Sequence, residues 1–124
     1  MGKTIKQIIQ RLDRQKINCF SEEDKLGWIG ELDGRIALEV CLMDVVQVQE
    51  FNYAYPQCLD HEPLIPFPYD GLYDLYLAAM IDFKHGEYDK YQNTMAQFEE
   101  QLDAFTVWFL NTYKPSQGYG EENG

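Results

Sequence analysis

The residues best suited to metal chemistry are Cys58 and His61, a cysteine and a histidine three positions apart. A structural zinc site usually combines two such close pairs of thiolate and imidazole ligands. The chain contains one such pair, and its remaining cysteines, Cys19 and Cys41, lie far from it and from each other in sequence. The ligand spacing therefore predicts no zinc site.

A second pattern that could hold a metal is Asp82 with His85, which have the i, i+3 spacing of the helix motif in di-iron proteins. Such a centre needs a second copy of the motif and two more carboxylates on facing helices, and the sequence contains no second copy. His85 lies beside Gly86, where a helix is expected to end and where a cation is favourable. We expect no metal ligands here.

Residue types for nucleophilic catalysis are also sparse. A catalytic serine or cysteine needs a nearby histidine and an acid that orients it, but the chain has two histidines, both in expected turns or loops. The glycines at positions 27, 30 and 34 follow helical spacing and do not form the phosphate-binding pattern GxGxxG after a strand. The sequence therefore predicts a protein that is not an enzyme and that uses no cofactor.

Two helices are expected in the first third of the chain. Thr4 and Gln7 have the spacing of a capping box, and four apolar residues at helical spacing follow, so a helix should run to about Gln15. Ser21 can cap a second helix. Three carboxylates follow it, in the first turn, where the helix dipole favours negative charge. Its apolar positions are Leu26, Ile29, Leu32, Ile36, Val40 and Met43.

Three glycines, Gly27, Gly30 and Gly34, lie inside this second helix. Each costs about 1 kcal/mol relative to alanine in an exposed helix interior. That cost indicates close packing of another backbone on at least one of them, and tolerated surface glycines remain the alternative.

The best-patterned stretch is a C-terminal helical hairpin. We expect a first helix from about Tyr69 to Lys84, a break at His85 and Gly86, and a longer helix from Glu87 to Tyr113. Apolar residues at alternating spacings of three and four form the seam of a helix that packs lengthwise on a partner. On the second arm these residues are Tyr88, Tyr91, Met95, Phe98, Leu102, Phe105 and Phe109. On the first arm they are Tyr69, Leu72, Tyr73, Tyr76, Leu77, Met80 and Ile81.

The pattern changes between the second helix and the hairpin. Apolar and polar residues alternate loosely across 46–55, which predicts an extended segment or a short β-strand pair. Four prolines between positions 56 and 68 predict a long loop. Together these patterns predict an all-α fold, a small bundle of about four helices with a long C-terminal hairpin. We expect a single helical domain over 1–115 and a disordered tail over 116–124.

Charge is distributed unevenly along the chain, whose formal net charge is −11. Residues 1–18 carry a local charge of +4, so the rest of the chain carries −15. An acidic body disfavours nucleic-acid binding because phosphate contacts need a basic face. The opposite signs permit a head-to-tail contact between identical subunits, although an acidic surface can also serve solubility alone.

Features of targeting and compartment are few. No run of about 18 apolar residues is present, so we expect no membrane-spanning helix. The N-terminus is a mixed amphipathic stretch and does not resemble a secretory signal. Three scattered cysteines favour a reducing cytoplasm over a secreted scaffold with disulfides.

Several aromatic residues near the proline-rich loop are candidates for contact with a partner. Amphipathic aromatics of this kind suit a protein interface, and they suit a satellite core under the loop equally well. Together with three cations of the first helix, the candidate interface residues are Lys6, Arg11, Arg14, Phe51, Tyr53, Tyr55 and Phe67.

Three stretches carry a resemblance to a known group of proteins. They are FSEEDKLGWIGELDGRI at 20–36, PFPYDGLYDLYLAAMID at 66–82 and GEYDKYQNTMAQF at 86–98. Together they resemble small proteins encoded in phages and prophages of Gram-positive bacteria, a group similar to the head–tail connector (head-completion adaptor) proteins. The resemblance runs over roughly residues 4–115 and lies in the overall pattern, without a catalytic motif.

This resemblance implies a small helical protein that is not an enzyme and forms a ring beneath the portal, joining it to the tail. Identical subunits, the portal and tail proteins would be its partners, and it would act in the host bacterial cytoplasm during assembly and then in the virion. An acidic surface would repel DNA in the ring's lumen, and residues 46–66 and the tail after Pro115 would contact portal or tail. The alternative is a small cytoplasmic protein-binding or regulatory module of prophage origin, acting as a dimer through the hairpin.

Overall fold

Helices make up nearly all of the regular structure in residues 2–113, the part of the chain that the computed structural model describes. This part contains no β-strand, so the predicted all-α class is confirmed. The predicted tail at 116–124 lies outside the described residues. In chain order the elements are α1 (Ile5–Gln15), α2 (Glu22–Glu39), α3 (Val45–Val48), the 3-10 helices η1 (Gln49–Phe51) and η2 (Gln57–Asp60), α4 (Gly71–Lys84) and α5 (Tyr88–Thr112).

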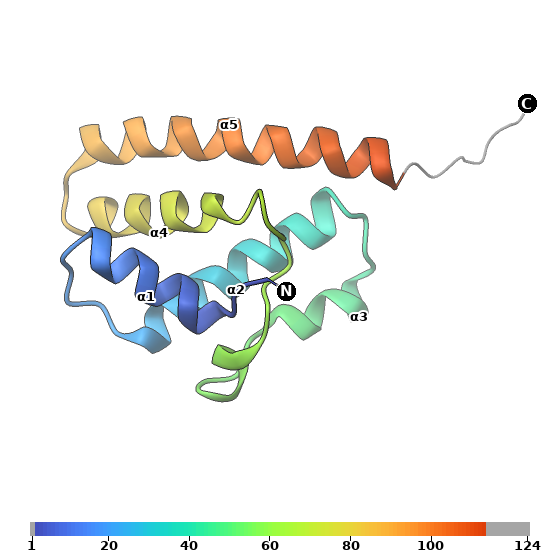
Figure 1. The fold of residues 1–124 in the computed structure, drawn as a ribbon, viewed down its shortest axis with the longest axis horizontal. Coiled ribbons are helices and arrows are strands. Elements are labelled where there is room, and N and C mark those ends of the chain that lie inside the picture. The colour runs from blue at the N-terminus through green and yellow to red at the C-terminus, as the bar shows by residue number, and fades with distance from the viewer. Residues whose placement is uncertain (1, 114–124) are drawn as a thin grey trace, which may run out of the picture.

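The centre of the fold is α4, which packs against α1, α2 and α5 (Figure 1). Its faces bury five large side chains, and α5 buries only Phe98 and Phe105. The predicted seam of α5 is therefore half-buried along most of its length, and Tyr88 at its start is exposed. The reason is that, within residues 2–113, α4 is the helix on which α5 packs extensively, and α4 is shorter: by helical rise α4 spans about 21 Å and α5 about 37 Å.

Local sequence signals explain where α1 and the hairpin begin and end. The predicted capping box of α1 is present: the Thr4 hydroxyl accepts from the Gln7 N–H at 3.2 Å, and the Gln7 side chain accepts from the Thr4 N–H at 2.9 Å. Gly86 has φ +76° at the break of the hairpin, a conformation that glycine adopts without a steric penalty. The helix boundaries predicted for both parts agree with the structure within about two residues.

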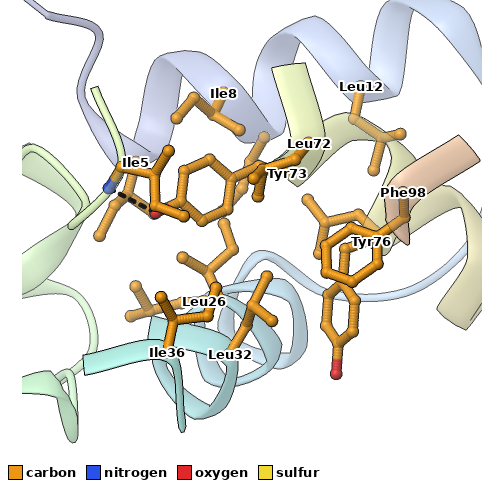
Figure 2. Close-up of a cluster of buried hydrophobic side chains, with 14 of the residues drawn as sticks. Ile5, Ile8, Leu12, Leu26, Leu32, Ile36, Leu72, Tyr73, Tyr76 and Phe98 are labelled. Atoms are coloured by element: carbon orange, nitrogen blue, oxygen red, sulfur yellow. Dashed lines mark hydrogen bonds between the residues drawn. The ribbon is translucent and has the colours of Figure 1, made fainter. Parts of the chain in front are cut away.

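Apolar side chains from four helices meet in one core, shown in Figure 2. The side chains that α1 contributes are the four at the predicted helical spacing. Those labelled in the figure are Ile5, Ile8, Leu12, Leu26, Leu32, Ile36, Leu72, Tyr73, Tyr76 and Phe98.

The prediction of an extended or β segment at 46–55 is wrong. The segment begins as α3 and continues as η1. Asp44 explains the helix start, because its carboxylate accepts from the Gln47 N–H at 2.8 Å while the Gln47 side chain accepts from the Asp44 N–H at 3.2 Å. This capping box outweighs the β preference of the valines at 45, 46 and 48.

The proline-rich stretch that follows is a loop, as expected, and contains the short helix η2. The Tyr55–Pro56 and Phe67–Pro68 peptide bonds are both cis. Ile65 in this loop is buried in the core, and η2 packs against α1, where the Ile5 N–H donates to the His61 carbonyl at 2.8 Å. The loop therefore forms part of the helical fold and covers it.

Candidate functional site

The glycine side of α2 receives the chain of α3 and η1. A Cβ atom added at Gly30 would lie 2.7 Å from the carbonyl oxygen of Phe51, closer than real contacts allow. At Gly34 the nearest atom, a Val48 methyl, would be at 3.6 Å, and at Gly27 nothing lies within 4 Å. Of the two alternatives from the sequence, close packing holds at Gly30 and an open surface at Gly27.

A groove of about 470 Å³ lies beside this contact, between α2 and the α3–η1 segment. Its floor is the glycine side of α2, and its walls combine apolar and polar side chains. The lining residues are Gly27, Gly30, Glu31, Gly34, Arg35, Leu38, Glu39, Val48, Gln49, Phe51, Asn52 and Tyr53.

The connection between α2 and α3 (Figure 1) carries a group of exposed apolar side chains, and one of them, Leu38, also lines the groove. We call Leu38, Leu42, Val45 and Val46 the apolar corner. Leu42 is 74% exposed and Val46 81%, and the other two are also exposed. Single exposed apolar residues are ordinary, but four within nine positions of chain form a patch that suits contact with another protein.

Leu42 itself adopts a left-handed backbone conformation, with φ +56°. Such a conformation costs about 1 kcal/mol or more for a residue that is not glycine. It ends α2 at Glu39, before the last two apolar positions of the predicted pattern, because the Cys41 N–H donates to the Ile36 carbonyl and the Met43 N–H to the Ala37 carbonyl. A leucine at this position therefore keeps an apolar side chain exposed in a place where glycine or asparagine would fit the backbone better.

A buried carboxylate holds the segment after η1 in place. Asp33 on α2 is fully buried and accepts three hydrogen bonds: from the hydroxyl of Tyr73, from the hydroxyl of Tyr53 at 2.7 Å and from the Leu64 N–H at 3.0 Å. The Tyr73 hydroxyl in turn accepts from the Ile65 N–H at 2.9 Å. We call these groups the Asp33 network. It joins α2, α4, the segment after η1 and the loop before α4.

Electrostatics within the Asp33 network follow from its burial. Burial raises the pKa of Asp33 from its ordinary 3.8 to about 6, although the hydrogen bonds from Tyr73, Leu64 and Tyr53 oppose this rise. Burial, together with the negative charge of Asp33, raises the pKa of both tyrosine hydroxyls well above 10. The tyrosines therefore remain protonated donors at neutral pH, and Asp33 is their acceptor.

The cations of α1 are partly used inside the fold. Arg11 makes a bidentate contact to Asp74 on α4, with Nε 2.9 Å from Oδ2 and Nη2 2.7 Å from Oδ1, and this hydrogen bonding raises the pKa of Arg11. Lys16 lies 2.8 Å from the buried carboxylate of Asp82. The charge complementarity expected between subunits is therefore satisfied in part between α1 and α4 of the same chain.

The seven candidate interface residues separate into two groups. Phe51 is buried against α2, Tyr53 gives its hydroxyl to Asp33, and Arg11 is paired with α4. The remaining residues are exposed, on α1 and on the proline-rich loop: Lys6, Arg14, Tyr55 and Phe67. The satellite-core reading therefore holds for Phe51 and Tyr53, and the interface reading stays a prediction for Tyr55 and Phe67.

Residues considered for metal binding are placed apart or engaged elsewhere. Within residues 2–113, no three His, Cys, Asp or Glu side chains are close enough together to hold a metal ion. Asp82 pairs with Lys16, and the ring of His85 stacks on Phe20 at a centroid distance of 5.5 Å.

Comparison with known proteins finds no similarity: no protein-family model, no curated protein and no solved structure matches the chain.

Across residues 2–113, none of the helices combines the length and the apolar character that crossing a membrane requires.

Proposed function

We propose that the protein is a non-enzymatic adaptor that binds other proteins, and that its role is that of a head–tail connector in a phage or prophage. Its partners would be identical subunits, the portal and tail proteins, and it would act in the host cytoplasm during assembly and then in the virion. The resemblance at 20–36, 66–82 and 86–98 supports the phage role.

The observation that carries the protein-binding role is the apolar corner. Exposed leucine and valine side chains gain free energy when a partner covers them, about 25 cal/mol for each Å² of apolar surface removed from water. Leu42, at its centre, has an unfavourable left-handed backbone conformation and an exposed apolar side chain. The adjacent groove offers a concave surface that a partner's side chain can enter.

The strongly acidic surface also supports this role. A connector ring must let DNA pass without holding it, and an acidic lining repels phosphate groups. The chain has 21 acidic and 10 basic residues, and four of the basic ones pair with carboxylates of the described fold: Arg11, Lys16, Lys25 and Lys90.

Binding through the apolar corner can be tested with Leu42→Asn combined with Val46→Gln. Asparagine accepts the left-handed conformation, so this variant should fold at least as well as the native chain. We expect it to bind the products of neighbouring genes at least about tenfold more weakly in titration calorimetry, because both apolar contacts are lost.

The matched control is Tyr88→Gln, which removes an exposed aromatic side chain at the first residue of α5. The start of α5 lies at the opposite end of the fold from the connection between α2 and α3 (Figure 1). We expect the control to bind its partners with unchanged affinity. Equal affinity of the corner variant and the native chain would refute the assignment of this surface.

A second candidate function is the regulatory module acting as a dimer through the hairpin. The outward side of α5 supports it, because Val107 and Leu110 are exposed there. A dimer that stays intact at nanomolar concentration and binds no neighbouring gene product would favour this function over the connector.

A further inference from the structure

We propose that the outward side of α1 in one copy of the chain binds the outward side of α5 in a second copy, with the two helices parallel. This inference rests on the self-association included in the proposed function and assigns the surfaces that carry it. The α1 strip consists of Lys3, Lys6, Arg14 and Ile17. The α5 strip consists of Glu99, Glu100, Asp103, Val107 and Leu110.

The α1 strip is positive because of how α1 packs on α4. The cations on the inner side, Arg11 and Lys16, are paired with carboxylates of α4, whereas Lys6 and Arg14 point away from the fold and are exposed. A shallow hollow of about 270 Å³ along this side is lined by Lys3, Gln7, Gln10, Arg11 and Arg14. The strip ends in Ile17, two residues after the last residue of α1, and the Ile17 side chain is 97% exposed.

The α5 strip is negative because the side of α5 that faces away from α4 carries acidic residues. Its inner side packs on α4, and its outer side carries Glu99, Glu100 and Asp103, all exposed. None of these three carboxylates has a cationic partner within residues 2–113. One and two turns further on, the same side presents Val107 and Leu110 to solvent.

The two strips match in order and in spacing. In α1 the distance along the axis from the middle of the Lys6–Arg14 pair to Gln15, the last helical residue, is about 8 Å at 1.5 Å per residue, and Ile17 lies two residues beyond this end. In α5 the distance from the middle of the three carboxylates to the middle of Val107 and Leu110 is about 11 Å. A parallel arrangement therefore places cations opposite carboxylates and Ile17 opposite the two apolar residues at the same time.

One chain cannot make this contact with itself, because α4 lies between α1 and α5 (Figure 1). Each copy carries both strips, on different sides of the molecule. The contact is therefore heterologous, and its repetition gives a head-to-tail series that closes into a ring when the rotation between neighbours allows it.

The test exchanges charges on exposed side chains that take no part in the core. Variant one carries Lys6→Glu and Arg14→Glu, and variant two carries Glu99→Lys and Asp103→Lys. Self-association of the full chain is measured by sedimentation equilibrium at about 50 mM and about 500 mM salt, since screening weakens exposed ion pairs. Lys84→Glu, an exposed change on α4, is the control.

We expect the native chain and the control to associate at low salt, and each reversed variant alone to associate at least about tenfold more weakly, since like charges then face each other. An equimolar mixture of the two variants should associate again, because each reversed strip finds an opposite charge on the other variant. A chain with all four changes should also self-associate.

Three results would overturn the proposal: no association of the native chain at low salt, reversed variants that associate as the native chain does, or a mixture that does not recover association. A fourth result would also overturn it: weaker self-association of variant two together with native self-association of variant one, which would point to contact between two α5 helices. Binding of other proteins through the apolar corner is measured separately, so these results leave the test of the proposed function intact.

Discussion

Replacing Tyr73 with phenylalanine removes one hydroxyl from the Asp33 network and leaves the buried ring in place. Two groups lose their partner: the Ile65 N–H, which donates to this hydroxyl at 2.9 Å, and the Oδ1 atom of Asp33, which accepts from it. The Oδ2 atom of Asp33 keeps its two donors. Both sites are shielded from water, because Tyr73 and Asp33 are fully buried. The variant therefore tests whether the network stabilises the fold.

The magnitude follows from the two orphaned groups. A buried donor or acceptor without a partner costs about 1–3 kcal/mol, and more when the group is charged. We therefore expect Tyr73→Phe to lower the free energy of unfolding by about 3 kcal/mol at pH 8. Tyr53→Phe, whose hydroxyl is only partly buried, should cost less, about 1 kcal/mol.

The pH dependence has a definite sign. The pKa of Asp33 in the folded chain, about 6, is above its ordinary 3.8, so the folded state holds this proton more tightly than the unfolded state. The corresponding stability is fully present below about pH 4 and is lost as pH rises through 6, and two pKa units correspond to about 3 kcal/mol. Because the Tyr73 hydroxyl favours the ionised carboxylate, its removal should cost more at pH 8 than at pH 5.

Urea unfolding at pH 5 and pH 8 measures these differences for the native chain, Tyr73→Phe and Asp33→Asn. Asp33→Asn removes the titrating group, so the stability of the native chain relative to this variant should fall between pH 4 and pH 7. A cost for Tyr73→Phe below about 0.5 kcal/mol, or the same cost at both pH values, would refute the reasoning.

Three further substitutions, two of them with a control on the same helix, test the packing of the helices by thermal or urea unfolding. Gly30→Ala should destabilise the chain by about 2 kcal/mol because its Cβ would meet a backbone carbonyl of η1. Gly27→Ala, in open space on the same helix, should stabilise the chain by about 0.5 kcal/mol. Equal effects of the two substitutions would contradict the close contact at Gly30. Arg11→Ala should cost about 1 kcal/mol because a bidentate pair with α4 is lost, whereas Arg14→Ala, on the outward side, should change stability by less than about 0.5 kcal/mol. Lys16→Ala should cost about 3 kcal/mol, since it leaves a buried carboxylate on α4 without its cation, and a cost near zero would show that water solvates this carboxylate.

Local signals in the sequence predicted much of the fold. The capping box at Thr4 and Gln7, the glycine at position 86 and the apolar spacing of the long helices are each contained within a few residues, so their consequences could be derived without the tertiary structure. The error at 46–55 arose because the prediction relied on the loose alternation of apolar and polar residues and did not consider the capping box of Asp44 and Gln47, which has the same spacing as the box of α1.

Long-range pairs of charged and polar groups could not be predicted in the same way. Asp33 and Tyr73 are 40 residues apart, and Arg11 and Asp74 are 63 residues apart, so neither pair leaves a local pattern. One signal was available: Asp33 follows Ile29 by four residues and precedes Ile36 by three, which places a carboxylate on the apolar side of the helix. Such a position indicates a buried acid but does not identify its partners.

The most direct test of the connector role is to mix the purified chain with the purified products of its neighbouring genes. Native mass measurement and negative-stain imaging then report what forms. The proposed function predicts ring-shaped complexes that contain several copies of the chain together with a portal or tail protein, and predicts that Leu42→Asn with Val46→Gln prevents their formation. A stable dimer that binds none of these products would contradict it.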